Sequence, residues 1–66
     1  MKELLVKFDH LSKVDREIAR ERLLHYHHEN EGVFLRVMRK PDEDWTEREI
    51  EFMDIMQAIR EKLELA

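Results

Sequence analysis

The hydrophobic positions between Trp45 and Leu65 follow the period of an amphipathic helix. Five of them are spaced three or four residues apart and therefore line one helical face: Phe52, Ile55, Met56, Ile59 and Leu63. Thr46 is placed to act as the N-cap, and Glu49, three residues later, is placed to complete a capping box. The sequence therefore predicts a helix over 45–65, with Trp45 and Ile50 at the two hydrophobic-staple positions.

A second helix is predicted from Ser12 to Glu29, with Ser12 as the N-cap and Asp15 at the third helical position. The segment 30–32 provides a stop, in which Gly32 is a candidate left-handed cap. The apolar residues of this helix fall into two groups on different sides: Leu11, Val14 and Ile18 form one group, and Ala19, Leu23 and Tyr26 form the other. A helix with a split apolar face usually touches two neighbours.

Two shorter apolar segments favour strands. In residues 33–40, the side chains of Val33, Leu35 and Val37 would point to one side of a strand. The segment has β-branched and aromatic residues directly after a glycine and ends at Pro41, which is typical of a strand. Residues 2–9 also alternate, although Leu4, Leu5, Phe8 and Leu11 fit a helical stripe as well, and period alone does not decide for so short a run. Because the helix at Ser12 needs the preceding element to end, a strand is the favoured interpretation.

The predicted fold class is therefore α+β, a single domain over residues 1–66 with the order strand, helix, strand, helix. Two strands joined by a crossover helix lie parallel, and a two-stranded sheet is only marginally stable in water. Its edges would pair with those of a second copy, so dimerisation is expected to complete the sheet. The alternative is an all-α three-helix assembly in which residues 2–9 are helical.

Composition adds a reason to expect association. The chain has 66 residues and no cysteine, so its core is limited and no disulfide supports it. No apolar run approaches the roughly 20 residues that cross a bilayer, and no signal-peptide pattern is present, so the expected location is the cytoplasm. The only serine already has a role as a cap, and a single glycine excludes a phosphate-binding loop. We therefore expect neither enzymatic activity nor a cofactor.

Charge is unevenly distributed along the chain. Residues 1–40 carry 9 Lys or Arg against 7 Asp or Glu, a net of +2, whereas residues 41–66 carry 3 against 9, a net of −6. The basic half offers Arg16, Arg20 and Arg36 to phosphates, so a dimeric DNA-binding transcriptional regulator is one alternative function. The acidic run between Asp42 and Asp54 suggests a second alternative, a mimic of the nucleic-acid backbone.

Histidines and acids near the end of the second helix offer a candidate metal site. Glu21, His25 and His28 share one stripe of the helix, and imidazole and carboxylate groups are ligands for zinc. Zinc sites are usually completed from a second element, however, and such a stripe is more often a solvated polar face.

The interpretation that accounts for most of these features is a small non-enzymatic protein-interaction module. We expect a regulatory or inhibitory adaptor of bacterial or phage type that forms a homodimer and binds a protein partner, because a chain this small has more apolar side chains than it buries alone. Methionine-bearing surfaces adapt to partners, and flanking acids tune association. The predicted contact residues are Phe34, Met38, Glu47, Glu51, Phe52, Met53 and Met56.

Overall fold

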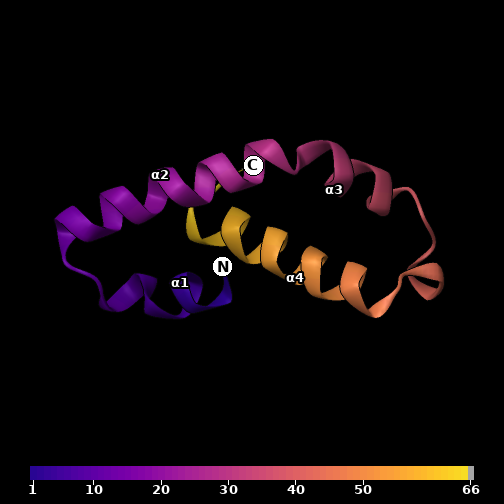
Figure 1. Ribbon diagram of the computed structural model, residues 1–66, viewed down its shortest axis with the longest axis horizontal. Helices are drawn as coiled ribbons and strands as arrows, with labels where there is room; N and C mark the ends of the chain where they lie inside the picture. Colours follow the sequence, from indigo (N-terminus) through magenta and orange to yellow (C-terminus); the bar gives the residue numbers. More distant parts are fainter. Residues whose placement is uncertain (66) are drawn as a thin grey trace.

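The computed structural model describes residues 1–65, and over that range the chain is helical (Figure 1). The elements in order are α1 (Lys2–Lys7), the 3-10 turn η1 (Phe8–His10), α2 (Lys13–Glu29), α3 (Glu31–Met38), the 3-10 turn η2 (Asp42–Asp44) and α4 (Glu47–Lys62). No strand occurs among these residues, so the α+β prediction and the sheet completed by dimerisation are wrong. The all-α alternative fits, with four α-helices in place of three.

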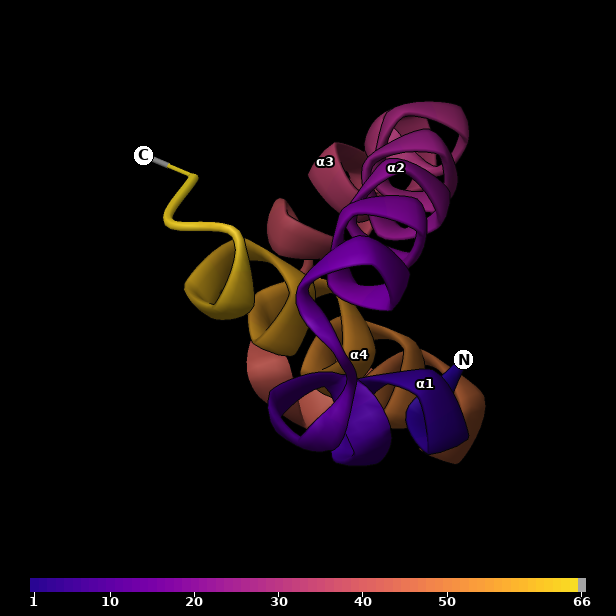
Figure 2. The same ribbon diagram turned by 90° about the vertical axis from the view of Figure 1, so that its left-hand side faces the viewer.

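The helices form two layers. Helices α2 and α3 follow one another along the first layer, and α4 runs back beneath both of them (Figure 1). Helix α1 lies in the second layer beside α4, below the start of α2, as the view along the long axis confirms (Figure 2). The result is an elongated molecule with extents of 40 × 18 × 17 Å.

The two long helices begin where the capping residues predict. The Asp15 amide donates to Ser12 Oγ at 3.2 Å, and the Glu49 amide donates to Thr46 Oγ1 at 3.2 Å. Glu49 Oε1 in turn accepts from the Thr46 amide at 2.9 Å, which completes the capping box. The predictions of a helix over 12–29 and a helix within 45–65 are therefore confirmed.

Residues 33–40 are helical because the predicted stop after α2 is only a local break. Asn30 Nδ2 donates to the Tyr26 carbonyl oxygen at 2.8 Å and so caps the end of α2. The Asn30 carbonyl then accepts from the Phe34 amide at 2.9 Å, and α3 starts at once. Gly32 lies inside α3 without a positive φ, so it is not a left-handed cap. Phe34 and Val37, three residues apart, are the buried positions, and this helical spacing replaces the expected alternation.

Residues 2–9 follow the helical stripe rather than the strand pattern. Leu5 is buried, and Leu4 and Phe8 pack against the same core cluster from partly buried positions. The break needed before Ser12 is supplied by η1 and by the extended backbone of Leu11, with φ −77° and ψ 153°, rather than by the end of a strand. Packing of α1 against α4 decides between the two periods that the sequence allows.

Helix α4 contributes to both parts of the core. One cluster consists of Leu5, Leu23, Ile59 and Leu63. The other consists of Phe34, Val37, Met53 and Met56, and Tyr26 packs against both. Among residues 1–65, no helix has the length and apolar character that crossing a membrane requires.

Candidate interaction surface

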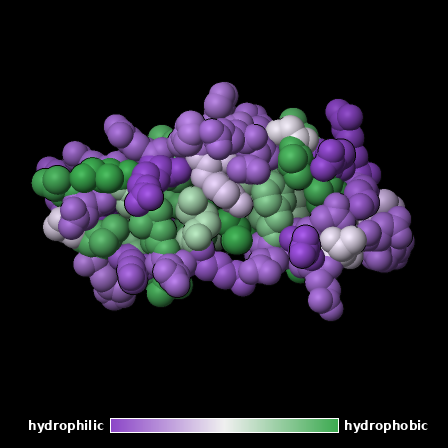
Figure 3. All heavy atoms as spheres, in the orientation of Figure 1, coloured by the Kyte–Doolittle hydropathy of each residue, from purple (hydrophilic) through white to green (hydrophobic). Residues whose placement is uncertain are grey.

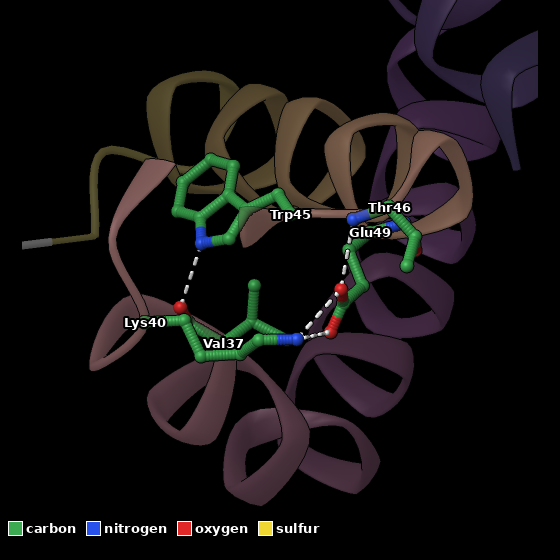
Figure 4. A network of polar contacts seen from close by, with 5 residues as sticks. All are labelled: Val37, Lys40, Trp45, Thr46 and Glu49. Atoms are coloured by element: carbon green, nitrogen blue, oxygen red, sulfur yellow. Dashed lines mark hydrogen bonds and ion pairs between the residues drawn. The ribbon is translucent and has the colours of Figure 1, made fainter. Parts of the chain in front are cut away.

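A polar network fixes the junction between α3 and α4 (Figure 4). Trp45 Nε1 donates to the Val37 carbonyl oxygen at 2.9 Å, and Lys40 Nζ lies 3.0 and 3.1 Å from the two carboxylate oxygens of Glu49. The hydrogen bond from the Thr46 backbone, together with that from Lys40, lowers the pKa of the Glu49 carboxyl group. This end of the molecule is therefore held by specific contacts.

The partner surface predicted from the sequence lies largely within the core at this end. Phe34, Met53 and Met56 are buried and pack together, with Phe52 partly buried against them. A partner does not reach these side chains while the domain is folded. The other three predicted contact residues are exposed: Met38, Glu47 and Glu51, the last of which pairs with Lys2 Nζ at 3.0 Å. The structure does not bring the seven residues together on one surface.

The histidines at the end of α2 have separate surroundings. His25 Nε2 lies 2.7 Å from Glu29 Oε1, and His28 Nδ1 lies 4.0 Å from Glu31 Oε2. Glu21 is exposed on the same helix. Within the part of the chain that the structure describes, no three His, Asp or Glu side chains are grouped as metal ligands. The candidate set Glu21, His25 and His28 is therefore a solvated helix face in this structure.

His27 is a core residue that sequence reasoning missed. Its ring lies 6.1 Å from the Phe34 ring, and its Nε2 atom lies 3.5 Å from Arg60 Nη1. The guanidinium of Arg60 also stacks over Phe34, at 5.6 Å from the ring centroid. The available signal was spacing, because His27 follows the buried residues Ala19 and Leu23 in steps of four.

The charged sequence features are dispersed over several elements. Arg16 and Arg20 are exposed on α2, and Arg36 is exposed on α3. In the acidic segment, residues 42–44 form the turn η2, Glu49 belongs to the capping network and Glu51 pairs with Lys2. The acidic run is therefore divided between a turn, a cap and an ion pair.

An exposed apolar surface lies at the opposite end of the molecule, where α1 and η1 turn back into α2. We call it the hairpin patch, and it consists of Leu4, Leu11, Val14 and Ile18. Val14 is 66% exposed and Ile18 is 55% exposed, whereas the two leucines are partly buried. Apolar side chains gather at this end in the space-filling view, at the left of Figure 3.

Three residues of the hairpin patch, Leu4, Leu11 and Ile18, line a shallow hollow between α1 and α2. The hollow has a volume of about 150 Å³ and is lined by Leu4, Leu11, Asp15, Ile18, Ala19 and Arg22. Its walls are thus aliphatic, with one acid and one base at the rim. A second hollow of about 250 Å³ lies on the other side of α1, against α4, and includes the exposed side chain of Val6.

Two residues of the hairpin patch, Val14 and Ile18, form one of the two apolar sides of α2 predicted from the sequence, whereas Leu11, predicted on the same side, precedes the helix. The other side, with Ala19 and Leu23, is buried in the core. Within residues 1–65, Val14 and Ile18 remain largely exposed to solvent. Of the two neighbours expected for a helix with a split apolar face, only one is supplied in full by this chain.

Comparison of the chain with protein-family models, with curated proteins and with solved structures finds no match in any of the three.

Proposed function

We propose that this chain is a small helical protein-interaction module that acts by binding another polypeptide through the hairpin patch. The observation that carries the proposal is the uncovered apolar side of α2, where Val14 and Ile18 are 66% and 55% exposed beside Leu11. Contiguous exposed apolar surface is the usual mark of a binding site. An adaptor or inhibitor, which works by occupying a surface of its partner, is the simplest role of this type.

The size and shape of the molecule support the proposal. Its accessible surface is 5260 Å², whereas a compact monomer of 8.2 kDa is expected to expose about 4,500 Å². Its radius of gyration is 12.7 Å, against about 11 Å for a compact domain of 66 residues. An elongated domain of this kind exposes more surface than a compact one of the same mass, so more of its apolar side chains stay in contact with solvent.

The two carboxyl groups with shifted pKa values serve to hold the fold together. The pKa values of Asp9 and Glu49 are lowered from their ordinary values. Asp9 owes its shift mainly to a hydrogen bond with Lys62, and Glu49 owes its shift to the α4 cap and Lys40. Each carboxylate forms an ion pair with a lysine of another segment at the surface, which is a structural use of charge.

Site-specific photo-crosslinking in cells that produce the protein tests this proposal. A photoreactive amino acid in place of Val14 is expected to form adducts with polypeptide, whereas the same group in place of Met38, an apolar residue on α3 that is 55% exposed, is not. The additional change Ile18→Gln should remove the adducts from position 14. Equal labelling at the two positions, or no labelling at position 14, would contradict the proposal.

A further inference from the structure

The structure points to a specific occupant of the hairpin patch. Resting on the proposed function, we infer that the polypeptide that covers the patch is a second copy of this chain. In this arrangement the two α2 helices (Lys13–Glu29) pack antiparallel about a two-fold axis that passes near Ile18.

The apolar seam has the spacing that helix pairing needs. Val14 and Ile18 lie four residues apart on α2, so they share one face of the helix, as core positions of paired helices do. Leu11 precedes the helix in extended backbone and lines the hollow beside Ile18. Leu4 and Ala19 border the hollow beside this seam. Side chains of a facing α2 therefore meet both a ridge, formed by Val14 and Ile18, and a depression with aliphatic walls.

The charges at the rim are self-complementary under the same symmetry. Asp15 and Arg22 line the hollow with Ile18, and they lie on either side of it along α2, three residues before and four residues after. In an antiparallel pair centred near Ile18, Asp15 of one copy lies opposite Arg22 of the other. The two-fold axis generates the same pair a second time, because each contact in such an interface occurs twice.

Both rim side chains are free to make these contacts. Asp15 and Arg22 are exposed, and neither belongs to an ion pair with another residue in the range 1–65. An acid and a base on the two sides of Ile18 complement a second copy of the same helix. Charge complementarity thus favours a copy of this chain as the partner.

The arrangement also places the rest of each copy away from the contact. The elongated shape of the molecule leaves this side of α2 open along its length (Figure 1). In this dimer α3 and the acidic turn η2 lie at the far ends, since they are at the end of the molecule opposite to the α1–α2 hairpin (Figure 1).

Charge reversal tests both the occupant and the orientation. The variants Asp15→Arg and Arg22→Asp each place like charges opposite one another in an antiparallel homodimer, so each alone should lose at least about thirtyfold in association constant. An equimolar mixture of the two should associate again, because residue 15 of one variant then faces an opposite charge at residue 22 of the other. Sedimentation equilibrium measures all three samples, and circular dichroism confirms that each variant keeps its helices.

Each outcome decides a different part of the inference. A wild-type dimer, single variants that do not associate and a mixture that does associate together support the antiparallel pair. Single variants that associate as strongly as the wild type, or a mixture that remains monomeric, overturn it. A wild-type protein that is monomeric, while the crosslinker at Val14 captures a different protein, overturns the second copy but leaves the proposed function standing. A monomeric wild type with no adduct at Val14 overturns both.

Discussion

Trp45 Nε1 donates a hydrogen bond to the carbonyl oxygen of Val37 at 2.9 Å, which joins the last turn of α3 to the entry of α4 (Figure 4). The same oxygen accepts from the Lys40 amide at 3.0 Å, so both of its acceptor positions are used. The contact places the aromatic ring of Trp45 against the core cluster of Phe34 and Met53. One side chain therefore caps one helix and fixes the direction of the next.

Replacing Trp45 with Phe tests the contribution of this hydrogen bond. The variant keeps an aromatic ring but removes the donor, and we expect the free energy of unfolding to fall by about 1 kcal/mol. Urea unfolding followed by far-ultraviolet circular dichroism is the appropriate measurement, because the chain has no other tryptophan for fluorescence. An unfolding midpoint equal to that of the wild type would show that the hydrogen bond does not stabilise the junction.

The capping network predicts acid sensitivity. Because contacts in the folded state lower the pKa of Glu49, the stabilisation by its carboxylate is complete above the ordinary glutamate pKa and is lost as the pH falls through the lower folded-state pKa. Glu49→Gln should therefore flatten this part of the profile of unfolding free energy against pH. Glu47→Gln, in the same first turn but outside the network, is the control. Parallel profiles for the wild type and Glu49→Gln would refute the prediction.

Met56 and Met38 provide a matched pair, because one is in the α3–α4 core and the other is at the surface. Met56 is fully buried, so Met56→Ala should lower the free energy of unfolding by about 2–5 kcal/mol, a large share of the stability of so small a domain. Met38 is 55% exposed, and Met38→Ala should change it by less than about 0.5 kcal/mol. Thermal and urea unfolding compare the two variants. Similar effects of the two substitutions would mean that Met56 is not in the core.

Gly32 offers a stabilising substitution. It lies in α3 with a negative φ, and a Cβ atom there would meet no heavy atom within 4 Å. Gly32→Ala should therefore raise the free energy of unfolding by about 0.5–1 kcal/mol, because alanine loses less backbone entropy in a helix. A left-handed cap would give the opposite sign, so a lower melting temperature for this variant would show that α3 does not continue through residue 32.

The helix boundaries set by side-chain caps were predictable from the sequence, whereas the short apolar segments were not. Ser12 and Thr46 carry their own start signals, since the bonds they accept come from residues three positions away. The segment that contains Val33 and Val37 has β-branched residues at alternating positions, which favours a strand locally. Packing of Phe34 and Val37 on α4 overrides that preference, and no local pattern reports a contact so distant in sequence.

The candidate surface was predictable only in part. The split apolar face of α2 was visible in the spacing of Val14 and Ile18. The interface predicted instead was centred on Met53 and Met56, which are core residues because α4 lies beneath both α2 and α3. Which apolar stripe stays uncovered depends on how the helices pair, and helix pairing is a property of the whole fold.

Sedimentation equilibrium of the wild type beside the variants Ile18→Asp and Met38→Asp tests the central claim most directly. Ile18 is 55% exposed on α2, so Ile18→Asp leaves the buried core of the monomer untouched, but it places two carboxylates side by side at the two-fold axis. We predict that the wild type and Met38→Asp associate to twice the chain mass of 8.2 kDa as concentration rises, and that Ile18→Asp remains at 8.2 kDa. An Ile18→Asp protein that associates as strongly as the wild type would contradict the account.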